Sequence, residues 1–172
     1  MENCLKKTAV KIKMVKVLLV ISLSGALGLL VSIIFAFLIV LSNSFFRYGT
    51  FRFFNEMVVL SLGIFGWYYV KSNVINFIFL IVLSTLYHLY RIIRDIYSID
   101  ARFRTLVLAL GNDRFEYASF SLKRVRRRIF GTFFKYLVIL IASYSISQSL
   151  HPLIVGGISL FVGVVLIALR LD

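Results

Sequence analysis

The chain has 172 residues, of which 60% are hydrophobic and 16% charged, and its mean hydropathy is +0.95. A soluble domain of this length is about half apolar and about a quarter charged, so this composition excludes a soluble globular protein and predicts an integral membrane protein. The net charge of +13 lies in basic blocks beside apolar stretches, which favours anionic lipid over nucleic acid as the counterpart. We therefore expect membrane lipids, and no nucleic acid, as partners.

The first apolar stretch, residues 17–41, has 25 positions without a charge. A helix of this length crosses a bilayer core of about 30 Å with some tilt. Residues 1–16 before it are rich in lysine, which predicts a cytoplasmic N-terminus. The stretch is longer than the apolar region of a signal peptide and ends without a small-residue cleavage pattern, so we expect an uncleaved helix.

Two shorter apolar stretches follow, residues 57–70 and residues 74–90, and they leave the number of crossings open. In the preferred arrangement, residues 74–90 return through the membrane and residues 57–70 lie at the outer interface as an amphipathic helix. This arrangement has four transmembrane helices and places both termini in the cytoplasm. The alternative makes residues 57–70 a short tilted span, which gives five crossings and places the basic block that follows outside.

This basic block, residues 91–130, contains ten basic and four acidic residues. We expect a cytoplasmic helical segment with an amphipathic helix near residues 100–110, capped by an aspartate and ended by Gly111. A second helix, from Arg114, is expected to run into the membrane. Its basic run is a candidate contact for lipid headgroups or an acidic partner surface. The residues of this run are Arg124, Arg126, Arg127 and Arg128.

The last two apolar stretches, residues 133–150 and 152–169, predict a closing helical hairpin with Pro152 at its turn. No flexible linker interrupts the sequence, so we predict a single all-α membrane domain over residues 1–172. Small residues recur at four-residue spacing in three spans, a pattern that lets helix backbones approach closely in lipid. The candidate helix-packing residues are Ser24, Gly28, Ser143, Ser147, Ser159 and Gly163.

Residues suited to catalysis are scarce. Cys4 is the only cysteine, which excludes an intrachain disulfide, and His88 and His151 belong to no metal-ligand spacing. We interpret His88 as a side chain at the membrane interface and His151 as a solvated turn residue. The predicted spans hold no carboxylate near their middle and the sequence has no glycine-rich phosphate loop. We therefore expect no catalytic residue, no cofactor and no metal.

Two segments resemble the small subunit I of bacterial ATP synthases, an accessory membrane protein with four spans. The first begins with Ser24-Gly-Ala-Leu-Gly28 and continues through residue 47. The second is the closing hairpin, with Phe134-Lys135-Tyr136 at its entry and Leu150-His-Pro-Leu-Ile154 at its turn. Together they cover about 70 of the 172 residues, while the apolar residues 57–90 and the basic block depart from that family's short central loop. The resemblance implies an assembly or ion-supply role beside a rotary ring and assigns no functional residue.

These observations favour a non-enzymatic integral membrane subunit, or an accessory or assembly factor, of a larger membrane protein complex. The expected protein partners are other membrane subunits or further copies of the chain. The alternative is a small oligomeric transporter or channel for an ion or a lipid, although its spans offer only Asn76, Gln148 and scattered serines as polar lining. The basic flanks are typical of a bacterial inner membrane, and an organelle membrane stays open as a second location.

Overall fold

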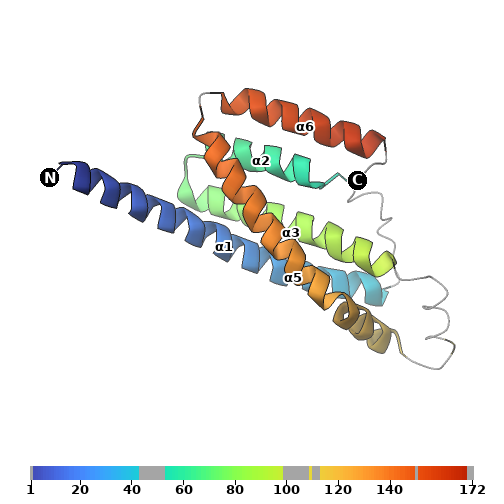
Figure 1. Ribbon diagram of the computed structural model, residues 1–172. Helices are drawn as coiled ribbons and strands as arrows, with labels where there is room; N and C mark the ends of the chain where they lie inside the picture. The colour runs from blue at the N-terminus through green and yellow to red at the C-terminus, as the bar shows by residue number, and fades with distance from the viewer. Residues whose placement is uncertain (1, 43–52, 99–108, 110–112, 150, 170–172) are drawn as a thin grey trace.

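The computed structural model describes residues 2–42, 53–98, 109, 113–149 and 151–169, and the regular elements among them are all α-helices (Figure 1). The helices of this part of the chain are α1 (Glu2–Ser42), α2 (Glu56–Tyr69), α3 (Asn73–Tyr97), α5 (Arg114–Ser147) and α6 (Pro152–Ala168). The all-helical class predicted from the sequence is confirmed. Three helices, α1, α3 and α5, are long and apolar enough to cross a membrane.

Local sequence explains where the helices begin. Asn55 caps α2, because its side-chain oxygen accepts a hydrogen bond of 3.0 Å from the amide of Val58. Pro152 is the first residue of α6, where the backbone amide would have no hydrogen-bond partner within the helix, so the missing N–H of proline costs nothing. The helix expected from Arg114 and the span expected at residues 133–150 are one continuous helix, α5. The helix expected near residues 100–110 lies outside the described residues, except for residue 109.

Helices α1 and α3 pack side by side and run in the same direction (Figure 1). Gly28 of α1 meets Ser84 of α3, and two turns further along both helices Ala36 packs in one cluster with Ile92. The structure differs here from the preferred four-span arrangement, in which residues 74–90 run opposite to residues 17–41. It matches the direction that these two segments have in the five-crossing alternative.

Helix α2 reverses the chain between α1 and α3. Glu56 at its start pairs with Arg91 near the end of α3, and Gly66 near its end contacts Phe79 near the start of α3. Helix α2 is therefore antiparallel to α3 and lies among α3, α5 and α6. Sequence reasoning left its role open because 14 residues span only about 21 Å as a helix.

Helices α5 and α6 also run in opposite directions to each other. Helix α5 runs opposite to α3, since Asp95 at the end of α3 lies 3.7 Å from Arg128 in the first half of α5. Helix α6 is antiparallel to α2 and packs on its outer side, away from α1 (Figure 1). Successive described helices thus alternate in direction. The first residues of α1, the α2–α3 connection and the α5–α6 connection share one end of the bundle, which we call the Lys16 end.

The core consists of two clusters along the seam of α1, α3 and α5. The first, toward the end of α3, contains Ala36, Ile92 and Val125. The second, toward the Lys16 end, contains Ile21, Leu80 and further buried side chains, among them two tyrosines. Because the seam joins three helices, the middle of the bundle is filled by side chains.

Candidate functional site

His88 lies in the middle of the bundle and is fully buried. Its Nδ1–H donates to the Ser84 carbonyl at 2.8 Å, and its ring meets the Tyr136 ring edge-on with the centroids 5.2 Å apart. The interpretation of His88 as an interfacial side chain is wrong. The face of α3 that carries Ser84 and His88 turns toward α1 and α5, so the ring is held between helices.

Ser84 joins α3 to α1 beside this histidine. Its hydroxyl donates to the Gly25 carbonyl at 3.2 Å, and the absence of a side chain at Gly28 lets α1 approach it. On the same face of α3, the Tyr136 hydroxyl of α5 donates to the Leu80 carbonyl at 2.8 Å. The Ser84 hydroxyl also lies 3.2 Å from His88 Nδ1. Because Nδ1 carries the proton that it donates to the Ser84 carbonyl, it has no free lone pair with which to accept the Ser84 proton in this arrangement.

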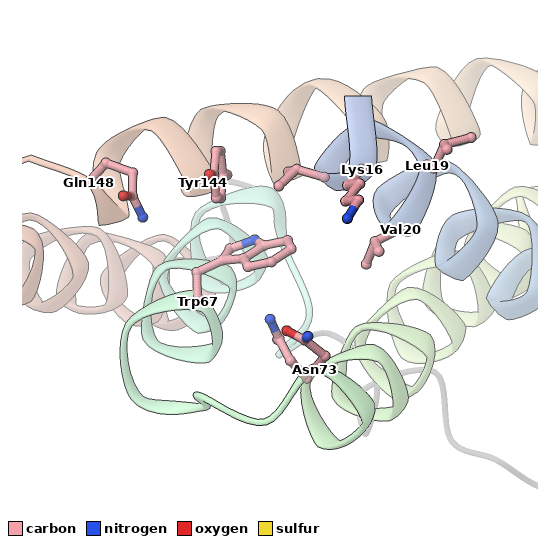
Figure 2. A pocket seen from close by; sticks show the side chains of 9 residues that line it. Lys16, Leu19, Val20, Trp67, Asn73, Tyr144 and Gln148 are labelled. Carbon is pink, nitrogen blue, oxygen red and sulfur yellow. The ribbon is translucent and has the colours of Figure 1, made fainter. Parts of the chain in front are cut away.

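A cavity of about 560 Å³ opens at the Lys16 end of the bundle (Figure 2). Three of its lining residues are apolar side chains of α1, and the others are polar or aromatic groups from the ends of several helices. Figure 2 shows the Trp67 ring in the middle of the cavity, with the amine of Lys16 pointing into the space between Trp67 and Val20. The lining residues are Lys16, Val17, Leu19, Val20, Trp67, Asn73, Asn76, Tyr144 and Gln148.

Two residues that line this cavity each have a buried polar atom without a hydrogen-bond partner among the described residues. These atoms are the side-chain oxygen of Asn76, a residue that is 6% exposed, and the indole Nε1 of Trp67. The Trp67 ring is held edge-on against Tyr144 of α5, with the centroids 5.1 Å apart. Buried polar groups are nearly always bonded, so an acceptor and a donor without partners on two lining residues are candidates for hydrogen bonds to a polar ligand in the cavity.

The candidate helix-packing residues are divided among three contacts. Ser24 is buried on α1 one turn before Gly28, at the contact with α3. Ser143 of α5 fits against Gly63 of α2, and Gly163 of α6 fits against α2. Ser147 is buried near the end of α5, and Ser159 is half-buried on α6.

The basic run of α5 lies on the outside of the bundle, with Val125 and Ile129 on the buried side of the same turns. The side chains of Arg124, Arg126, Arg127 and Arg128 are exposed. Arg128 lies next to Asp95, so part of the charge of this run neutralises a carboxylate on α3.

A second ionic contact lies at the same end of the bundle as this run. Arg91 pairs with Glu56, and its guanidinium lies 5.8 Å from the centre of the Tyr87 ring and 5.7 Å from that of the Tyr90 ring. Such placement over aromatic rings stabilises a partly buried cation. Glu56 and Asp95 are thus both used to hold helices together.

The described residues bring no set of three histidine, cysteine, aspartate or glutamate side chains together that could hold a metal ion. The bundle has two polar regions, one around His88 and one at the cavity beside Trp67. Both contain buried polar atoms without a hydrogen-bond partner among the described residues, His88 Nε2 and the Tyr87 hydroxyl at the centre and the two atoms named above at the cavity. The centre at His88 is a closed junction between helices, whereas the cavity at Trp67 is open. Comparisons of the chain with protein-family models, with curated proteins and with solved structures find no match.

Proposed function

We propose that the protein is a non-enzymatic integral membrane subunit or accessory factor that packs against other membrane protein chains, in a bacterial inner membrane. The observation that supports this most is the amount of apolar surface left uncovered. Only 28% of the most apolar part of α1 and of α5 is buried within the chain. Exposed side chains such as Leu19, Phe134 and Phe161 are 63–70% accessible. Apolar surface of this extent is stable only against lipid or another apolar protein surface.

The use made of the ionisable groups supports a structural role. Glu56 and Asp95 are paired with arginines, and the Nδ1 of His88 is committed to a helix carbonyl. Small residues stand at the helix contacts, which is how helices associate where the hydrophobic effect is absent. These contacts describe a scaffold whose polar side chains serve packing.

We also propose that all five described helices cross the membrane. The alternating directions of the helices support this arrangement, in which the N-terminal segment and the α3–α5 connection face opposite sides. Helix α2 is shorter than a bilayer core of about 30 Å, and local thinning of the bilayer accommodates a short span.

Cysteine labelling tests this topology. In sealed vesicles, a membrane-impermeant maleimide is applied to the native chain, whose only cysteine is Cys4, and to a Cys4→Ser/Asp113→Cys variant. We expect that one of the two is labelled before detergent is added and the other only afterwards. Inverting the vesicles should exchange the results. Labelling of both from the same side would support four spans and contradict the five-span proposal.

Photo-crosslinking in native membranes tests the subunit role. A photoreactive amino acid replaces an exposed residue on each of three helices, Ile34, Phe134 and Phe161, and the buried Leu80 serves as the control. We expect at least one exposed position to give a discrete crosslink to a different membrane protein, which also co-purifies at stoichiometric yield in mild detergent. Crosslinks to lipid alone, together with a chain that purifies by itself, would contradict the proposal.

A further inference from the structure

The cavity at the Lys16 end has an amphipathic lining that the proposed packing role does not use. Lys16 provides a cation at the point where the apolar stretch of α1 begins, and Val17 and Val20 provide apolar surface toward the middle of the helix. Asn73 stands at the start of α3 and Gln148 at the end of α5. Lys16 therefore stands at the start of an apolar stretch, Asn73 and Gln148 stand at helix ends, and Val17 and Val20 begin the apolar part, an arrangement that suits a ligand with a polar head and apolar chains.

We propose that this cavity binds the head of one anionic phospholipid whose headgroup carries a hydroxyl, such as phosphatidylglycerol. Lys16 and the indole N–H of Trp67 are donors for a phosphate, which only accepts hydrogen bonds when ionised. The unpartnered oxygen of Asn76 is an acceptor and needs a donor from the ligand. A hydroxyl of the headgroup supplies this donor, and the acyl chains leave over Val17 and Val20.

Charge and shape both favour this occupant. Among the described residues, the lining contains one cation and no carboxylate, so a head with net negative charge is preferred to a zwitterionic one. Asn76 is more than nine-tenths buried and lines the cavity, and its oxygen has no partner among the described residues, so a donor on the bound headgroup would satisfy it. This inference rests on the proposed membrane location.

Trp67 makes the site directly measurable, because it is the only tryptophan of the chain and lies within the cavity. Bromine atoms on lipid acyl chains quench tryptophan fluorescence at contact distance. The protein is reconstituted in phosphatidylcholine vesicles that contain equal small fractions of brominated phosphatidylglycerol or brominated phosphatidylcholine. We expect phosphatidylglycerol to bind the site about fivefold more tightly than phosphatidylcholine, because one basic residue near the headgroups adds about 1 kcal/mol of attraction to an anionic lipid.

Two lysine variants separate the site from general surface charge. Lys16→Gln should remove the preference for brominated phosphatidylglycerol, whereas Lys135→Gln, which removes an exposed lysine outside the cavity, should retain it. Asn76→Leu, of similar size, should weaken the preference while the chain stays monodisperse in detergent. Equal preference in Lys16→Gln and in the native chain would overturn the proposal.

The remaining outcomes are also decisive. Equal quenching by both brominated lipids in the native chain shows an inserted protein without a selective site and overturns the lipid proposal alone. Absence of quenching by either lipid shows that the chain is not inserted, which contradicts the membrane location as well. Soluble glycerol phosphate should not reverse the quenching; reversal would show that the site recognises free phosphate and overturn the assignment to a lipid.

Discussion

The contact between Gly28 and Ser84 should be the most sensitive point of the α1–α3 seam. A Cβ atom at Gly28 would lie 2.4 Å from both side-chain atoms of Ser84 and 2.9 Å from the carbonyl oxygen of Ile81. The carbonyl belongs to the helix backbone and cannot rotate away, so Gly28→Ala must push α1 and α3 apart. Such overpacking destabilises by about 1–3 kcal/mol.

The higher helix propensity of alanine partly offsets this destabilisation. Alanine is favoured over glycine within a helix by roughly 1 kcal/mol. We therefore expect Gly28→Ala to lower the free energy of unfolding by up to about 2 kcal/mol, which for a chain of this length lowers Tm by up to about 8 °C. Thermal unfolding in mild detergent, followed by circular dichroism, measures the change.

Gly157→Ala is the matched control, because a Cβ atom at Gly157 has no atom within 4 Å among the described residues. It should leave Tm unchanged or raise it. Ser84→Gly in the Gly28→Ala background removes the clashing atoms and should restore part of the loss, so that the two substitutions are not additive. If Gly28→Ala is as stable as Gly157→Ala, the close approach of α1 and α3 argued above is incorrect.

Two further substitutions test bonds between helices by the same unfolding measurement. Tyr136→Phe removes the hydrogen bond to the Leu80 carbonyl and should lower the free energy of unfolding by about 1 kcal/mol. Tyr69→Phe is the control, because this side chain is 64% exposed, and it should leave the free energy of unfolding unchanged. Equal losses in the two variants would contradict the bond between α3 and α5. Asn55→Ala removes the cap of α2 and also the 3.0 Å hydrogen bond from the Asn55 side-chain nitrogen to the Gly163 carbonyl. It should lower the free energy of unfolding by about 2–3 kcal/mol. A loss no larger than that of a surface substitution would show that other contacts hold α6 against α2.

The sequence predicted the helices well and their directions poorly. The apolar stretches at residues 57–70 and 152–169 correspond closely to α2 (Glu56–Tyr69) and α6 (Pro152–Ala168). A hydropathy pattern does not show which way a helix runs across the membrane. The direction of α3 was therefore inferred from the basic residues 91–130, treated as a cytoplasmic loop. The structure includes both ends of that block in α3 and α5, which weakens its value as a topological signal.

The burial of His88 had a signal in the sequence that was not used. Leu80, Ser84, Tyr87 and His88 follow one another at spacings of four, three and one, which places them on one face of a helix. A histidine on the same face as three buried side chains belongs to a contact between helices. Its neighbours Tyr90 and Arg91 instead suggested the membrane surface.

The cavity could not be found from the sequence alone. Lys16, Asn73 and Gln148 are more than 50 residues apart from one another, and each is an ordinary polar residue at the end of an apolar stretch. They meet only because α1 and α3 begin, and α5 ends, at one end of the bundle. That fact depends on α3 running parallel to α1, a direction that the preferred four-span arrangement did not include.

The attachment of α6 has a consequence for how the chain is assembled during synthesis. The side chains of Asn55 and Ser61 on α2 donate to the carbonyls of Gly163 and Gly156, residues that are made 108 and 95 positions later. Until α6 is made, Ser61 can donate to a carbonyl of its own helix, as Thr85 does, but the Asn55 side-chain nitrogen lacks the Gly163 acceptor. We therefore expect α2 to reach its final hydrogen bonding only after α6 has been synthesised and has packed against it.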